Sequence, residues 1–214
     1  MKKVILLTLF MMLGCSGFAA TYYSRVATGN FATAGTWSVN RSGTPTNATA
    51  LAAGDIFFIQ NGHSITLAAN QSANQITIES GGSLAPNNNR TLTLTNPLII
   101  QNGGTLSLTT RTLTFGASSL ENSGSITGST GEISRTTGTF TNTATGTVSI
   151  SGAAAFVMGT GNFINNNTSS SVNFGSSAIT ISGTANQSIG GFTTTGRFTA
   201  SKTAGTTTLT GGIN

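Results

Sequence analysis

Residues 76–84 read ITIESGGSL, and the same pattern returns 22 residues later at 98–106 as LIIQNGGTL. Residues 57–65, FFIQNGHSI, fit this frame one copy earlier. Residues 120–126, LENSGSI, fit it one copy later, at a spacing of 20. A phrase that recurs at such intervals indicates a repeat architecture, because a unit of about 20 residues buries its apolar side only by stacking on its neighbours.

Each unit reads as three short strands with turns between them. A second phrase, RTLTL at 90–94 and RTLTF at 111–115, alternates apolar and hydroxyl residues as a strand buried on one face does. Gly81 and Gly103 fall in the turns, where glycine adopts positive φ without strain. No segment after Ala20 shows an apolar helical period. The units are therefore predicted to be entirely β.

Stacking would pair each strand in parallel with its equivalents about 4.8 Å above and below. The frame then places Ile78, Ile100 and Leu120 in one core column of successive coils. We predict an all-β fold, a right-handed parallel β-helix. A β-sandwich with the same number of strands is the alternative, but it would not require one nine-residue phrase to recur.

The first twenty residues predict export. Lys2 and Lys3 precede an apolar run at 4–14, and residues 17–19 offer a small-x-small cleavage site, so residues 1–20 are predicted to be a signal peptide. The apolar run is too short to span a bilayer and no second run follows, so the mature chain is predicted to contain no transmembrane segment. The expected location is outside the cell or on its surface.

Cys15 is the only cysteine and leaves a second interpretation of this leader open. Residues 12–15, MLGC, resemble a bacterial lipoprotein cleavage box, in which the cysteine becomes the lipidated first residue. Leu13 stands where a small residue is usual. We favour ordinary cleavage, with lipid anchoring at Cys15 as the alternative. A single cysteine permits no disulfide within the chain.

The remainder divides into two predicted segments. Residues 21–52 do not follow the pattern of the repeats, and they contain Trp37. The open end of a solenoid core must be covered by another segment. We therefore predict an N-terminal cap in which Trp37 packs on the first coil. Residues 53–214 are predicted to be β-helix repeats. Because 206–213 still read as repeat, we expect the repeats to continue beyond residue 214.

Three short motifs in this region resemble known extracellular proteins. They are GTWS at 35–38, AGD at 53–55 and GHSITL at 62–67. Their order resembles the start of the extracellular domain named for its eight glycines, and the N-termini of large β-helical proteins of Gram-negative bacteria with a type IX secretion system. The resemblance covers about residues 21–85. It implies a β-helical fold and a secreted or surface location, and it supplies no catalytic residue.

The charge composition narrows the classes of partner. Nine basic and four acidic residues give a net charge of +5, but charged residues are only 6% of the chain, against about a quarter in ordinary domains. The bases are scattered and no aromatic residues interleave with them, so nucleic acid is not an expected partner. We expect an extracellular polysaccharide or a cell-surface component instead.

Four polar residues of the repeat bear on catalysis. The frame places Gln60, Glu79, Gln101 and Glu121 in one column, with the two carboxylates about 9.6 Å apart. This separation is near the upper limit for an inverting glycosidase pair. We favour a solvated Gln/Glu ladder, because nothing in the sequence around these residues indicates a pocket that would raise a pKa. No catalytic residue is therefore assigned.

The remaining candidates concern ligands. Arg90 and Arg111 are predicted to stack, and a bound anionic glycan would relieve their repulsion, although both side chains can also extend into solvent. His63 is predicted to occupy a turn position and Asp55 to cap a turn. Neither residue has enough partners for a metal site, so we assign no metal and no cofactor.

These observations favour a non-catalytic structural or adhesive module, secreted or on the cell surface, with a long side suited to an extended partner. The alternative is the N-terminal part of a polysaccharide lyase or glycoside hydrolase built on a β-helix. The chain is accordingly predicted not to be an enzyme.

Overall fold

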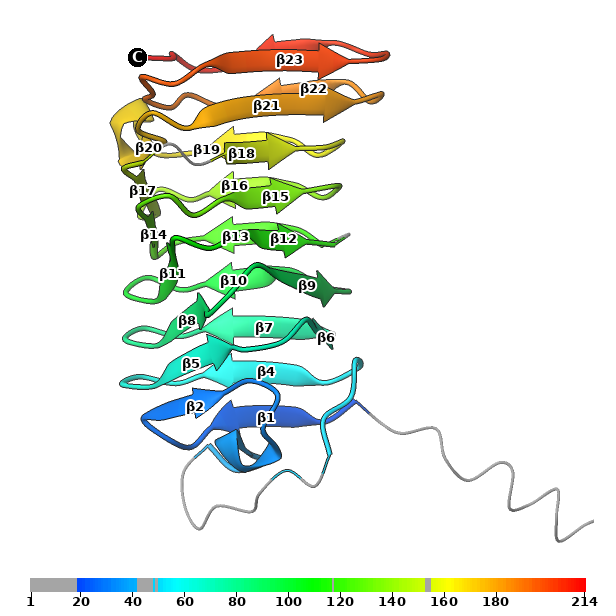
Figure 1. The fold of residues 1–214 in the computed structure, drawn as a ribbon, viewed down its shortest axis with the longest axis vertical. Coiled ribbons are helices and arrows are strands. Elements are labelled where there is room, and N and C mark those ends of the chain that lie inside the picture. Colours follow the sequence, from blue (N-terminus) through cyan, green and yellow to red (C-terminus); the bar gives the residue numbers. More distant parts are fainter. Residues whose placement is uncertain (1–18, 42–47, 49, 117, 153–154) are drawn as a thin grey trace, which may run out of the picture.

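The computed structural model describes residues 19–41, 48, 50–116, 118–152 and 155–214. In these residues the chain winds into a stack of coils whose strands form three parallel sheets (Figure 1). The predicted signal peptide and Cys15 lie outside the described residues, apart from the last two residues of the leader. Among the described residues, no helix is both long enough and apolar enough to cross a bilayer.

Each of the six coils from β4 to β21 contributes one strand to each of the three sheets. Sheet A contains, in spatial order, β3 (Trp37–Ser38), β1 (Thr21–Ser24), β4 (Ile56–Ile59), β7 (Gln75–Ile78), β10 (Leu98–Ile100), β13 (Leu120–Asn122), β16 (Phe140–Asn142), β19 (Phe163–Asn165), β22 (Gln187–Ile189) and β24 (Thr207–Leu209). Sheet B contains β2 (Thr28–Asn30), β5 (Ser64–Leu67), β8 (Ser83–Pro86), β11 (Thr105–Thr109), β14 (Ser125–Gly128), β17 (Thr147–Ile150) and β20 (Val172–Asn173). Sheet C contains β6 (Gln71–Ala73), β9 (Arg90–Leu94), β12 (Leu113–Phe115), β15 (Ile133–Arg135), β18 (Ala155–Met158), β21 (Ala178–Gly183) and β23 (Phe198–Lys202).

The strand pairing confirms the parallel β-helix and excludes the sandwich. Equivalent strands of neighbouring coils pair in parallel, as β4 does with β7 and β7 with β10. In Figure 1 the chain climbs from bottom to top, with sheet C running to the right in front and sheet A running to the left behind, which is a right-handed winding. Among the described strands, β3 alone pairs antiparallel, with β1.

The core is a set of apolar columns inside the coils. In sheet A the inward column runs through Ile76, Leu98, Leu120, Phe140 and Phe163, all at most 1% exposed. In the later coils phenylalanines dominate and their rings touch between sheets. Because each strand is short, such cross-coil contacts supply most of the burial that stabilises the fold.

The N-terminal cap packs as predicted. A 3₁₀ turn, η1 (Ala34–Thr36), leads into β3 and places Trp37 over the open end of the core, where its side chain is fully buried. Its ring meets Phe31 and Phe57 with centroids 5.0 and 4.7 Å apart, and its Nε1 donates to the Phe31 carbonyl oxygen at 2.8 Å. The indole therefore covers apolar surface and keeps its polar atom bonded.

The solenoid begins earlier than residue 53. Strands β1 and β2 pair in parallel with β4 and β5, so residues 21–30 already form an incomplete coil before the first full coil, which begins with β4. The segment that closes the end is shorter than the predicted cap and consists of η1 and β3, with the residues around them. Asp55 lies close to the predicted boundary between the cap and the repeats, and it links the two segments through hydrogen bonds.

The predicted frame is wrong by two residues in the fourth coil. Ile78 does pair with Ile100, but the next rung of this column is Asn122, and Leu120 pairs with Leu98 instead. The turn from sheet A to sheet B is shorter between β13 and β14 than between β10 and β11. The turn residues therefore align with the repeated phrase, whereas the residues of the preceding strand of sheet A do not. The predicted column of Ile78, Ile100 and Leu120 is therefore not formed.

Candidate functional site

The outer side of sheet B presents a long uncharged surface, which we call the hydroxyl face. Strand alternation turns every second side chain outward, and these outward side chains line up in two rows along the stack. The first row contains Thr28, Ser64, Ser83, Thr105, Ser125 and Thr147. The second row contains Asn30, Thr66, Ala85, Ser107, Thr127, Ser149, Asn173 and Thr193. None of these residues is buried, and none carries a charge.

The hydroxyl face repeats at the spacing of the strands. Neighbouring rungs lie about 4.8 Å apart along the axis, and the two rows lie about 6.8 Å apart along each strand. Ser83 donates from its Oγ to the Oγ of Ser64 at 3.0 Å, so hydroxyls of adjacent coils can bond to each other. The Oγ1 atoms of Thr147 and Thr193 donate to the carbonyl oxygens of Gly124 and Ser169, each at 3.4 Å. The surface can therefore offer a partner many weak, regularly spaced hydrogen bonds.

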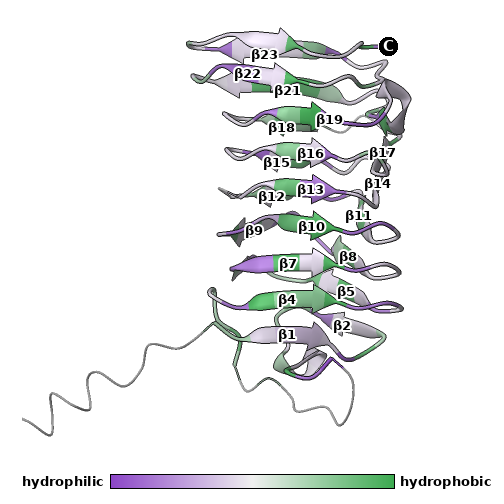
Figure 2. Ribbon diagram, turned by 180° about the vertical axis from the view of Figure 1, so that it is seen from behind, coloured by the Kyte–Doolittle hydropathy of each residue, from purple (hydrophilic) through white to green (hydrophobic). Residues whose placement is uncertain are grey.

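Sheet A carries an aromatic pair on its outer side close to the cap. Tyr23 and Phe58 stack with centroids 5.2 Å apart, and the guanidinium of Arg41 lies over both rings, 4.7 and 5.5 Å from their centroids. Figure 2 shows this side, where β4 and β10 carry the strongest hydrophobic colour. Arg41 also forms two hydrogen bonds to the carboxylate of Glu79. The rings are thus covered by the protein's own cation, which leaves no open stacking platform.

The predicted column of carboxylates is not assembled. Glu79 follows Ile78, as Gln101 follows Ile100, but the residue in this position of the next coil is Ser123. Glu121 instead pairs with Ile99 and Thr141 on sheet A. The carboxylate of Glu79 forms an ion pair with Arg41, and its hydrogen bond raises the pKa of Arg41. The two glutamates therefore differ in position and in environment.

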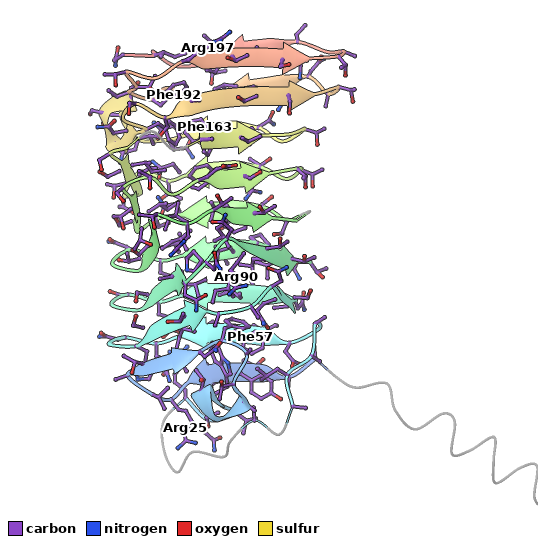
Figure 3. All side chains as sticks on the ribbon, in the orientation of Figure 1. Arg25, Phe57, Arg90, Phe163, Phe192 and Arg197 are labelled. Atoms are coloured by element: carbon purple, nitrogen blue, oxygen red, sulfur yellow. The ribbon has the colours of Figure 1, made fainter. Side chains whose placement is uncertain are left out.

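Arg90 and Arg111 do not form the predicted rung. Arg90, the first residue of β9, pairs with Leu113, and Arg111 lies two residues before that position in the turn between β11 and β12. The reason is a longer turn in the third coil, where Thr109 has φ 50° and the register of β11 shifts. Both arginines nevertheless lie at the corner between sheets B and C. Figure 3 shows Arg90 midway along the axis, between Arg25 near the capped end and Arg197 near the other.

Asp55 and His63 have the structural positions that the sequence indicates. The buried carboxylate of Asp55 accepts from the backbone N–H of Ala20 at 2.9 Å and of Ala52 at 2.6 Å, so it caps the turn before β4. His63 lies in the turn before β5, and its Nδ1 is 2.7 Å from Ser24 Oγ. Within the described residues no three of His, Cys, Asp and Glu come together as a metal site would require.

Three features were not predicted from the sequence. The side-chain amides of Asn122, Asn142 and Asn165 are hydrogen-bonded in a row, the first two fully buried. Arg41 covers the aromatic pair on the outside, and Arg135 lies in the core. The row of asparagines could have been predicted only from the recurrence of asparagine at similar places in successive units. Arg135 and Arg41 had no signal, because nothing in a single strand tells which arginine faces inward.

Comparisons with protein-family models, with curated proteins and with solved structures found no match for this chain.

Proposed function

We propose that the protein is a non-catalytic structural or adhesive module, secreted or on the cell surface, that binds an extended polysaccharide along its side. The observation that carries this proposal is the hydroxyl face, whose two rows continue over successive coils without a charged residue. A polymer that itself repeats polar groups can meet such a surface at many points. Each hydrogen bond contributes little, but contacts along one chain reinforce each other.

The position of Arg90 and Arg111 extends the proposal to acidic polymers. Both residues lie where sheet B passes into sheet C, in successive coils, so they flank the hydroxyl face. Arginine pairs well with carboxylate and sulfate groups. A polymer on the hydroxyl face could therefore place its anionic groups at this corner, which keeps both arginines as proposed ligand contacts.

The environments of the acidic residues favour binding over chemistry. The carboxylate of Asp55 accepts hydrogen bonds from two backbone N–H groups, and that of Glu79 accepts from Arg41. Glu121 lies in a different column from Glu79. General acid–base catalysis on a glycan needs two groups with separated pKa values on either side of the scissile bond. The described acids do not provide such a pair.

Binding can be tested with the purified chain and a panel of neutral and acidic polysaccharides, by depletion onto insoluble polymers and by affinity electrophoresis in soluble ones. The double variant Thr105→Glu, Ser125→Glu places bulk and charge on adjacent rungs of the hydroxyl face and should reduce affinity at least tenfold. The matched control, Thr180→Glu with Thr199→Glu, makes the same change on adjacent rungs of sheet C and should bind like the wild type. Equal binding by both variants, or no binding to any polymer, would contradict the proposal.

Two further measurements separate the versions of this function. Loss of binding at high salt and in Arg90→Ala or Arg111→Ala would identify an anionic polymer, since exposed charges are screened by salt. We also expect no reducing ends and no unsaturated products from the same panel. Cleavage that disappears in Glu79→Gln or Glu121→Gln would instead establish the alternative, a lyase or hydrolase.

A further inference from the structure

The interior of the fourth coil contains a charged residue. Arg135 ends β15 and occupies the column of Phe115 and Met158, which lie directly on either side of it. Its side chain is only 1% exposed, and both neighbours in the column are fully buried. An arginine at a position that is apolar in adjacent coils requires a specific compensating environment, because an unpaired charge is costly to bury.

The protein supplies part of that environment. The Nη2 group of Arg135 donates to the carbonyl oxygens of Ser118 and, at 3.3 Å, Thr137, and the guanidinium lies 5.2 Å from the centroid of Phe115. Its Nε and Nη1 atoms are buried without a hydrogen-bond partner. Burial lowers the pKa of Arg135 to about 10, so the group remains charged at neutral pH.

Two hydroxyls at the same corner are also unpaired. Ser118 Oγ and Thr137 Oγ1 are buried without a hydrogen-bond partner, and they belong to the two residues whose carbonyls already contact Arg135. Two unpaired groups of Arg135 and two unpaired hydroxyls of the residues that bond its Nη2 therefore occur together at the bend that leads from sheet C to sheet A. All four can donate a proton to a ligand.

No carboxylate of the described residues forms an ion pair with Arg135. Among the described residues the one ion pair joins Arg41 to Glu79, near the capped end of the stack. The only acid near Arg135 in the sequence is Glu132, and neither its side chain nor any other carboxylate is hydrogen-bonded to the guanidinium in the described part of the chain. Burial accounts for the shifted pKa of both residues, with no attraction between them.

We propose that this corner binds a small monovalent anion, with chloride as the ligand, held by one of the two unpaired N–H groups of the Arg135 guanidinium and by the hydroxyls of Ser118 and Thr137. A water molecule would satisfy some of these donors but would leave the buried charge uncompensated. A chloride ion can accept from the hydroxyls and from a guanidinium N–H group, and it cancels the charge. The site is separate from the hydroxyl face, so it does not depend on the proposed polysaccharide binding.

Thermal unfolding of the whole chain tests this directly, in sodium chloride and in sodium gluconate at equal ionic strength. Gluconate is too large for a buried site. Once chloride exceeds its Kd, each further tenfold increase should raise the Tm by about 3–6 °C relative to gluconate, because a ligand that binds only the folded state stabilises it by mass action. The Arg135→Met variant, which copies Met158 of the next coil, should lose this dependence, and Arg197→Met is the control that should retain it.

Two more measurements keep the proposal testable if Arg135→Met does not fold. The double variant Ser118→Ala, Thr137→Val keeps the charge but removes two donors, and it should require a higher chloride concentration for the same Tm. Crystals soaked in sodium bromide should show an anomalous peak within hydrogen-bonding distance of Arg135. A Tm that follows chloride equally in wild type and Arg135→Met, or a crystal with water alone at this position, would overturn the proposal.

Discussion

The side-chain amide of Asn122 donates a hydrogen bond to Oδ1 of Asn142 at 2.8 Å, from one coil to the next, in the interior of the solenoid. Asn142 in turn donates to Oδ1 of Asn165 at 3.0 Å. The same amides donate to backbone carbonyls of the following turns, as Asn122 does to Thr147 at 2.9 Å and Asn142 to Gly146 at 2.9 Å. The chain of asparagines therefore fastens each turn to the strand that precedes it.

Removing the central asparagine should destabilise the protein. Asn142→Ala removes three hydrogen bonds at a fully buried position, to Asn122, Asn165 and the Gly146 carbonyl, and each such bond contributes about 0.5–1.5 kcal/mol. We expect the free energy of unfolding in urea to fall by at least about 2 kcal/mol. Asn96→Ala, which removes an exposed amide pair, is the control and should change it little. Similar losses in the two variants would contradict the role of the buried chain.

Trp37 should be the most sensitive residue of the cap. Trp37→Ala removes a fully buried ring in contact with Phe31 and Phe57, and large-to-small changes of this kind cost about 3–5 kcal/mol. Trp37→Phe keeps an aromatic cover but leaves the Phe31 carbonyl unbonded, so it should cost less. Urea denaturation of both variants measures the difference. If the alanine variant were as stable as wild type, the cap would not cover the core.

Close packing between coils makes some glycines irreplaceable. A Cβ at Gly161 would lie 1.6 Å from the carbonyl oxygen of Gly138, so Gly161→Ala must displace the turn of the preceding coil. Overpacking of this kind costs about 1–3 kcal/mol. Gly54→Ala meets no atom within 4 Å and should have little effect, which makes it the matched control. Thermal unfolding that ranks the two variants in the opposite order would refute this account.

Glu132 should make stability fall as the pH rises. Burial raises the pKa of this carboxyl above its ordinary value of 4.5, so between the ordinary and the raised value the folded state binds more protons than the unfolded state. Stability then decreases with pH across this interval. Glu132→Gln should be more stable than wild type at neutral pH, and the gain should vanish below pH 4.5. Urea unfolding at several pH values checks this, and a gain that persists in acid would contradict it.

The pair of Arg41 and Glu79 should contribute little to stability despite its two hydrogen bonds. Half of the Arg41 side chain is exposed, and water and salt screen such a pair. A double-mutant cycle with Arg41→Ala and Glu79→Gln should give a coupling energy of about 0.5 kcal/mol that shrinks in 1 M salt. A coupling energy several times larger and independent of salt would show that the pair contributes substantially to the stability of the cap.

The amino-acid sequence by itself determined the fold class. The recurring phrase at 76–84 and 98–106, the alternation within strands and the glycines in the turns were enough to predict parallel stacking, because all three are local properties that repeat along the chain. The burial of Trp37 and the capping role of Asp55 also followed from position and residue type. These features depend on near neighbours in the sequence, which a repeat makes visible.

The tertiary structure alone decided which residues share a rung. Turns of different length displaced Leu120 from Ile100 and Arg111 from Arg90, and they separated the two glutamates that a constant frame had placed together. Polarity also fails to identify the inward position, because a buried asparagine can replace an isoleucine when its amide is bonded to the next coil, as at Asn122. Which polar side chains are compensated in this way depends on the neighbouring coils, and this is set only when the coils stack.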